Sequence, residues 1–254
     1  MYKRQVLVGS ALSLSGAAYQ GVFKNPLVAP DLLGVSSGAC VGASVAILLH
    51  LNSFGVQAMA FVAGILAVGL TLFIPRLIKN TNMTMLVLSG IIVKGIMDSV
   101  MGIIKYVADP ETELQSITYW QLGSLTKVLP RDLFTVGPVI IAASVIIFLL
   151  RWRINILSLG DREAKTLGVS VTVVRNFIII CATLLTASAV CISGTIGWIG
   201  LVIPHFARML TGPDNTKAIP ASILIGAIFM VAIDTLARAL TCLLYTSDAA
   251  DDKA

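Results

Sequence analysis

The sequence predicts an all-α, polytopic membrane helical bundle, and three observations support this fold class. Of the 254 residues, 57% are hydrophobic and only 12% are charged, whereas a soluble domain of this length needs a much larger charged surface. The apolar residues form blocks of about 20, the length that spans a hydrocarbon core of ~30 Å. The blocks are continuous and rich in Leu, Ile, Val and Ala, unlike the alternating strands of an outer-membrane barrel.

Eight apolar segments account for most of the chain. They cover about residues 6–23, 35–51, 54–75, 84–106, 133–150, 172–192, 196–210 and 219–241. Each is predicted to be a membrane helix, but the seventh is short and glycine-rich, so we expect it to be broken or only partly inserted. Small residues recur within the segments, at Gly9, at Gly16 and from Gly38 to Gly42. Because small residues let helix backbones approach closely in lipid, they predict one tightly packed domain.

The loop charges predict the orientation of the segments. Lys and Arg collect in cytoplasmic loops because they resist translocation. Basic residues occur in three groups: Arg76 and Lys79, five residues between 151 and 175, and two within 208–217. Two predicted membrane crossings separate each group from the next. The loop 107–132 carries four acidic and two basic residues and is expected to be external. The same rule accounts for the net charge of +5, which therefore does not indicate a nucleic-acid partner.

Several kinds of site are not expected. The four cysteines and two histidines lack the spacing of a metal or disulfide site, so no metal or cofactor is predicted. The sequence contains no Gly-x-x-x-x-Gly-Lys-Ser/Thr phosphate loop and no nucleophile–base pair, so the chain itself is not expected to be an enzyme. Residues 1–5 and 243–254 resemble non-native ends attached to a functional span of residues 6–242.

A polar segment after the fifth apolar segment is the strongest sign of a soluble partner. Gly160 and Gly168 bracket it as helix breakers. The chain between them is too polar for the bilayer, yet Ala164 and Leu167 share one face of a short helix. Such an amphipathic helix beneath the membrane suits the docking of a partner protein. A membrane-surface helix without a partner is the alternative that this stretch alone leaves open.

Two ionisable residues interrupt the middle of the segment 84–106. Lys94 and Asp98 lie near its middle, where each such group costs roughly 2.5–3.5 kcal/mol on insertion scales. Their spacing of four residues lets them pair on one helix face. As a pair they would face either the interior of the bundle or a water-filled pathway.

Five stretches of the sequence resemble the FecCD family of permeases, which serve ABC importers of iron siderophores, heme and vitamin B12. They cover residues 19–27, 30–39, 120–125, 159–164 and 194–208, and they keep the family order between residues 6 and 242. The resemblance implies a subunit of ten membrane helices, of which about eight are present in this sequence. It also implies that two permease subunits enclose one translocation path.

The resemblance further implies two partner proteins. The coupling element that fits a cleft of a separate ATPase would consist of Gly160, Asp161, Arg162, Glu163, Ala164, Leu167 and Gly168. Arg238 matches the family position that meets an extracytoplasmic substrate-binding protein, and Asp234 could hold it through an i, i+4 ion pair. An arginine that only snorkels to the membrane interface is the alternative for Arg238.

Three groups of residues are candidates for the pathway and its gate. They are Lys94 and Asp98, then Asn25, Ser36 and Ser37, and finally Asn82, Met83 and Thr84. By resemblance the first group lines the path, where Lys94 would favour an anionic chelate, although a mutually neutralised structural pair fits equally well. The second group flanks a proline-rich break expected at the cytoplasmic side beneath the path. The third aligns with the cytoplasmic gate, although loop polarity alone would explain it.

These observations predict the permease subunit of an ABC importer in a bacterial inner membrane. Its expected cargo is a ferric siderophore or a similar iron chelate, with cobalamin or heme as alternatives. Its expected partners are an ATPase, a substrate-binding protein, a second permease subunit and membrane lipid. A secondary transporter without an ATPase is the alternative from another class, but it gives no role to the segment from Gly160 to Gly168.

Overall fold

A computed structural model describes residues 2–79, 82–126, 128 and 130–251, with side chains as far as Leu240. Met1 and residues 252–254, at the ends predicted to be non-native, lie outside the described residues. The described part of the chain is all-α and contains no strand, which confirms the predicted fold class. Its elements are α1 (Tyr2–Phe23), η1 (Pro30–Leu33), α2 (Val35–Leu48), α3 (Ser53–Leu77), α4 (Met83–Val107), α5 (Glu113–Leu122), α6 (Pro130–Leu159), α7 (Asp161–Thr166), α8 (Val171–Ser193), α9 (Ile199–Thr211) and α10 (Asn215–Asp251).

All eight predicted apolar segments contain helices, but only six of these helices are long and apolar enough to cross a membrane. The six are α1, α3, α4, α6, α8 and α10 in the described residues, whereas α2 and α9 are shorter apolar helices. The prediction of a broken seventh segment is confirmed, because residues 194–198 are irregular and α9 begins only at Ile199. The second segment is shorter than predicted, since α2 has 14 residues and rises only ~21 Å at 1.5 Å per residue.

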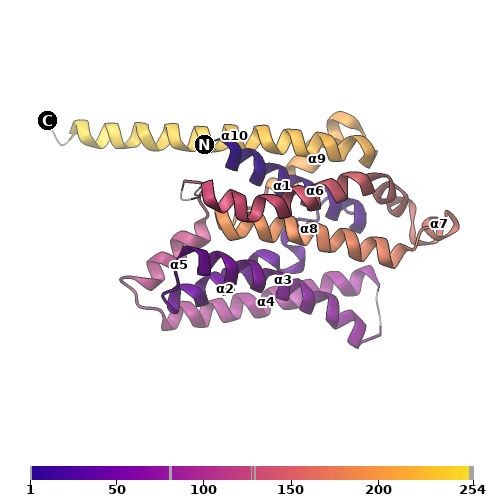
Figure 1. The fold of residues 1–254 in the computed structure, drawn as a ribbon, viewed down its shortest axis with the longest axis horizontal. Coiled ribbons are helices and arrows are strands. Elements are labelled where there is room, and N and C mark those ends of the chain that lie inside the picture. The colour runs from indigo at the N-terminus through magenta and orange to yellow at the C-terminus, as the bar shows by residue number, and fades with distance from the viewer. Residues whose placement is uncertain (1, 80–81, 127, 129, 252–254) are drawn as a thin grey trace.

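The bundle surrounds two central helices. In α1 and α8, 83% and 78% of the membrane-spanning window is buried, against 22–33% in the four other long helices. Figure 1 shows α2, α3, α4 and α5 grouped on one side of this core and α9 and α10 on the other. The remaining long helix, α6, packs against both α1 and α8. The apolar side chains of α1 and α8 thus form the core, and the outer helices present apolar surface to lipid.

Glycines allow the closest helix contacts, as the sequence predicted. A Cβ atom on Gly16 of α1 would collide with the backbone carbonyl of Gly200 in α9. A Cβ atom on Gly9 would likewise collide with the Gly226 carbonyl in α10, and one on Gly42 in α2 would collide with the Met59 carbonyl in α3. Helix backbones approach this closely only where no side chain intervenes.

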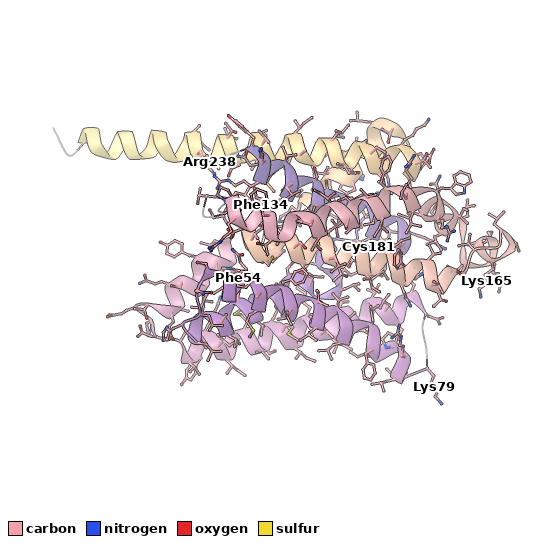
Figure 2. The ribbon with its side chains drawn as sticks, viewed as in Figure 1. Phe54, Lys79, Phe134, Lys165, Cys181 and Arg238 are labelled. Carbon is pink, nitrogen blue, oxygen red and sulfur yellow. The ribbon has the colours of Figure 1, made fainter. Side chains whose placement is uncertain are left out.

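The charged loops divide between the two ends of the bundle. Figure 2 shows Lys79 and Lys165 at one end, here called the basic end, and Arg238 and Phe54 toward the opposite end. Lys24, just after α1, joins the basic end through an ion pair between its Nζ and Asp161 Oδ1 at 3.5 Å. The basic loops that were predicted to share one side of a membrane therefore lie together.

The N-terminal residues pack against the bundle. Arg4 donates a hydrogen bond from Nη1 to the Val128 carbonyl at 2.7 Å, and the buried Gln5 donates one to Asp234. At the other end of the chain, the backbone of α10 continues as helix to Asp251. The assignment of residues 1–5 and 243–254 as non-native stays a prediction.

Candidate functional site

A cavity of about 440 Å³, lined by both polar and apolar side chains, lies inside the bundle and is here called the central cavity. Two irregular segments create it. Residues 24–34 turn back from the end of α1, so that α2 starts beside the middle of α4, and residues 194–198 lead into α9. Irregular backbone at membrane depth is tolerated only where protein buries it or where it borders a water-filled space. The central cavity borders both irregular segments.

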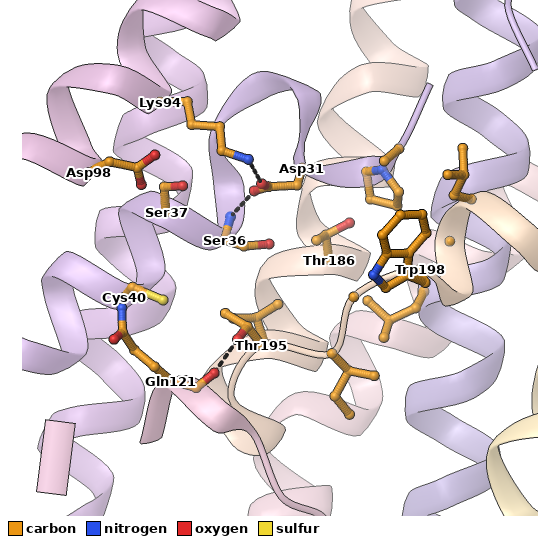
Figure 3. Close-up of a pocket in the computed structure, with 18 of the residues that line it drawn as sticks. Asp31, Ser36, Ser37, Cys40, Lys94, Asp98, Gln121, Thr186, Thr195 and Trp198 are labelled. Atoms are coloured by element: carbon orange, nitrogen blue, oxygen red, sulfur yellow. Dashed lines mark hydrogen bonds and ion pairs between the residues drawn. The ribbon is translucent and has the colours of Figure 1, made fainter. Parts of the chain in front are cut away.

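Asp31 organises one wall of the central cavity. Its Oδ1 accepts a hydrogen bond from the Ser36 backbone N–H at 3.1 Å, at the start of α2. Its Oδ2 accepts one from Lys94 Nζ on α4 at 2.7 Å (Figure 3). Gly34 turns the chain from η1 into α2 with a φ of 80°, which glycine adopts without strain. One carboxylate therefore joins η1, α2 and α4.

The ion pair of Lys94 differs from the sequence-based expectation. Lys94 was expected to pair with Asp98 one turn along α4, but its partner is Asp31. Asp98 lines the same cavity, close to Ser37 in Figure 3. The lining thus contains two carboxylates and one ammonium group, so the cavity is not the cationic environment that an anionic chelate would favour.

Sequence reasoning missed Asp31 as a site residue. The available signal was an acidic side chain directly after Pro30, inside the proline-rich break, in a chain with an isolated lysine in the middle of an apolar segment. Only the fold shows that these two residues, 63 positions apart, are in contact.

Hydroxyl and amide groups complete the central cavity. Ser36 and Ser37 come from α2, Thr186 from α8 and Thr195 from the irregular segment. The Thr195 hydroxyl donates to the Gln121 backbone carbonyl at the end of α5, and the Trp198 ring also lines the cavity (Figure 3). These groups offer hydrogen bonds without fixing the charge of an occupant.

The second candidate group is divided between two places. Ser36 and Ser37 line the central cavity next to Lys94, near the middle of α4, rather than the cytoplasmic side expected for them. Asn25 lies just beyond α1, where its Oδ1 accepts a hydrogen bond from the Leu27 N–H at 2.9 Å. The cause is the return of the chain between residues 24 and 34, which separates Asn25 from the two serines.

The predicted gate residues lie at the basic end. Asn82 and Met83 line a recess of about 290 Å³, together with Asp161 and Lys165 of α7 and Arg175 of α8. Thr84 is exposed and is not among the lining residues of this recess. The structure therefore places Asn82 and Met83 beside the predicted coupling segment and away from the central cavity.

The predicted coupling segment is a short helix at the basic end (Figure 1). Gly160 and Gly168 flank α7 with φ angles of 146° and 76°, which confirms that glycines bracket it. Ala164 is fully buried, whereas Leu167 is 59% exposed. Contrary to the expected shared face, Leu167 lies beyond the last helical residue and leaves an apolar side chain in solvent.

The charged residues of α7 serve two purposes. Asp161 Oδ1 accepts a hydrogen bond from Arg175 Nη2 at 2.7 Å, which ties α7 to α8. This hydrogen bond, together with the nearby charges of Arg175 and Lys24, lowers the pKa of Asp161. Arg162 and Glu163 are exposed and remain available to a partner.

At the opposite end, Arg238 forms the ion pair with Asp234 that the sequence predicted. Arg238 donates to both carboxylate oxygens of Asp234, from Nε at 2.7 Å and from Nη2 at 3.3 Å. This geometry confirms the i, i+4 pair. The two residues border a recess of about 710 Å³ that also includes residues 122–126 and 195–197. A fork held on two oxygens is preorganised rather than free to snorkel.

Residues 4–245 match the FecCD transport family. The chain belongs to this family. It is 37% identical to the molybdate import system permease MolB of Haemophilus influenzae, over 92% of this chain and 69% of that protein. It is 39% identical to a permease proposed for an iron chelatin transport system of Helicobacter pylori strain 26695, over 93% of this chain and 71% of that protein. It is thus an ABC importer permease.

A solved structure supports the same assignment at the level of the fold. Its description proposes a metal-chelate type ABC transporter in an inward-facing conformation. The TM-score is 0.89 at 36% sequence identity, covering 94% of this chain and 76% of that chain. The FecCD resemblance inferred from five sequence stretches is therefore confirmed, as is the helical membrane architecture.

Proposed function

We propose that this FecCD-family permease carries a ferric siderophore or a similar iron chelate across a bacterial inner membrane. The observation that carries the proposed translocation path is the exposed position of charged groups on α4. The Lys94 side chain is 46% exposed in the single chain and Asp98 is exposed beside it, both near the middle of a membrane-spanning helix. Lipid-facing charges at this depth are costly. This face of α4 therefore borders a water-filled translocation path, and a second permease subunit covers the other side of the path.

The basic end receives the ATPase in this proposal. α7 is anchored to the bundle by Ala164 and by the Asp161–Arg175 ion pair, while Leu167 and Arg162 stay exposed. A short helix with one buried anchor and an exposed apolar residue suits a cleft in a soluble partner. ATP binding and hydrolysis would take place in that partner. Asn82 and Met83, beside α7, form the cytoplasmic gate.

The opposite end receives the substrate-binding protein. Arg238 is held as a fork by Asp234 and retains donors for an acidic side chain of the partner. The recess beside this pair borders residues 195–197, which also line the central cavity. Cargo released at this end would therefore meet the polar wall formed by Ser36, Ser37 and their neighbours.

The choice of iron chelate rests on the named relatives. The Helicobacter relative is proposed for iron chelatin and the solved structure for a metal chelate. The Haemophilus relative imports molybdate by its name and is nearly as similar. Heme and cobalamin remain the alternatives within the family, and a secondary transporter without an ATPase would leave α7 without a role.

Uptake into proteoliposomes tests the proposal. The permease would be assembled with its ATPase and binding protein and supplied with a ferric siderophore, heme, cobalamin or molybdate, with and without ATP. We expect ATP-dependent uptake of the ferric siderophore above that of the other three. Uptake of any cargo without the ATPase would contradict the permease mechanism. ATP-dependent uptake of only another member of the panel would replace the iron chelate as the cargo.

A substitution on α7 tests the docking site. Because Leu167 is 59% exposed, Leu167→Asp should leave the bundle folded but place a charge in the apolar contact with the ATPase. We expect co-purification of the ATPase to fall at least 10-fold while the melting temperature stays unchanged. Leu159→Asp is a matched control, since Leu159 is 65% exposed at the end of α6. An equal loss in both variants would argue against α7 as the specific contact.

A further inference from the structure

The recess at the basic end is lined by more cationic than acidic side chains. It lies between α3, α4, α7 and α8 and is called the basic recess below. Its charged lining consists of Arg76, Lys165 and Arg175 against the single carboxylate of Asp161. It shares no lining residue with the central cavity. The basic recess is therefore a separate site with an excess of two positive charges.

The positive charges are incompletely paired. Asp161 is already engaged by Arg175 at 2.7 Å and by Lys24 at 3.5 Å. Among the described residues, neither Arg76 nor Lys165 has an ion-pair partner. The Nε atom of Arg175 is buried and has no hydrogen-bond acceptor in the described part of the chain. A buried donor without an acceptor is costly, so an anion in the recess would satisfy it.

Two helices also begin at the basic recess. Met83 at the start of α4 and Val171 at the start of α8 both line it. The N-cap residue of α8, Ser170, makes no side-chain capping hydrogen bond. The first backbone N–H groups of a helix and its dipole favour an anion. They act here together with three cationic side chains.

We propose that the basic recess binds a phosphate group, supplied either by the headgroup of an anionic lipid or by free phosphate. Basic clusters at the cytoplasmic membrane surface attract anionic headgroups, and the basic end has this character. Phosphate offers acceptors to Arg175 Nε, Arg76 and Lys165 at once. Because these residues belong to α8, α3 and α7, the bound group joins α7 to α3 and α8.

Binding can be measured on the purified full chain. Its melting temperature would be recorded in detergent with inorganic phosphate, and with chloride at matched ionic strength. A second series would use nanodiscs of phosphatidylcholine alone or mixed with phosphatidylglycerol. We expect phosphate, phosphatidylglycerol or both to raise the melting temperature. A response to phosphate alone identifies a free anion, and a response to phosphatidylglycerol alone identifies the headgroup. No response to either overturns the proposal.

A pair of double variants separates a built site from general surface charge. Arg76→Gln with Lys165→Gln removes two charges that line the recess and should weaken binding by roughly 100-fold, about 10-fold for each lost charge-assisted hydrogen bond. Lys79→Gln with Arg153→Gln removes two exposed charges of the same end that do not line it. We expect this control to bind as the parent chain does. An equal loss in both double variants overturns the proposal.

Discussion

Asp31 links three elements through one side chain, and the strength of that link can be measured. Its carboxylate contacts the start of α2 and Lys94 of α4. Since the two side chains are 31% and 46% exposed, solvent screens the pair, and we expect a coupling energy of about 1 kcal/mol. A double-mutant cycle with Asp31→Asn and Lys94→Met, followed by unfolding in detergent, would give this value.

The same cycle distinguishes the two carboxylates of the central cavity. Asp98→Asn combined with Lys94→Met should show a smaller coupling, because Asp98 makes no ion pair with Lys94. A larger coupling with Asp98 than with Asp31 would restore the pair that the sequence alone suggested.

Asp161 gives α7 a defined dependence on pH. Hydrogen bonding to Arg175 lowers its pKa below the ordinary value of 3.8. Its contribution to stability is therefore complete above that value and is lost as the pH falls through the lower folded-state pKa. We expect Asp161→Asn to destabilise the chain equally at pH 7 and pH 5, by less than about 1 kcal/mol because the group is half exposed.

The difference between Asp161→Asn and the parent chain should shrink below about pH 4. Unfolding in acid-stable detergent at pH 7, 5 and 3 would follow it. Glu163→Gln is the control, since Glu163 is exposed and makes no ion pair in the described residues. A difference that grows as the pH falls would contradict the ion pair.

At the scale of helices, the contact between α1 and α9 depends on the absence of a side chain. Gly16→Ala would force the two backbones apart, and overpacking of this kind costs about 1–3 kcal/mol. Gly69→Ala in α3 is the matched control, because nothing lies within 4 Å of the position of its added Cβ atom, and alanine favours helix by about 1 kcal/mol. Melting temperatures should fall for the first variant and stay level or rise for the second. A tolerated Gly16→Ala would mean that the helices separate easily.

The apolar pattern predicts helices well and their interruptions less well. A run such as 84–106 becomes α4 (Met83–Val107) because the bilayer leaves helix as the only way to pair every backbone group. The apolar pattern overestimated the length of α2 (Val35–Leu48), since hydropathy does not show where a chain turns back inside the protein. Pro26 and Pro30 indicated a break between two helices, but the position of this break along the membrane normal depends on contacts with α4.

At the scale of the whole molecule, the arrangement of charges predicts sidedness. Lys79 lies at the basic end, whereas the exposed Glu111 precedes α5 in the loop predicted to be external. A membrane-impermeant maleimide should label Lys79→Cys only from the cytoplasm and Glu111→Cys only from outside. The parent chain, which keeps its own four cysteines, measures the background; among the described side chains, Cys40, Cys181 and Cys191 are buried. Reversed labelling would invert the orientation and the proposed ATPase contact with it.

The candidate site was predictable in part. Glycines around α7 and the spacing of Asp234 and Arg238 are local features, so the sequence was sufficient for both. The partner of Lys94 and the separation of Asn25 from Ser36 depend on long-range contacts. Local spacing suggested Asp98 for Lys94 because residues four apart are the only neighbours that a sequence displays.

The uninterrupted course of α8 has a mechanical consequence. It runs from Val171 to Ser193 without an internal proline, a stiff rod of ~35 Å at 1.5 Å per residue. Near its first turn, Arg175 forms an ion pair with α7. At its last residue, the Ser193 carbonyl accepts a hydrogen bond at 2.7 Å from the N–H of Ser124, which lies just beyond α5. A displacement of α7 that moves the first turn of α8 would therefore also move its last residue, because the helix between them has no proline at which it could bend.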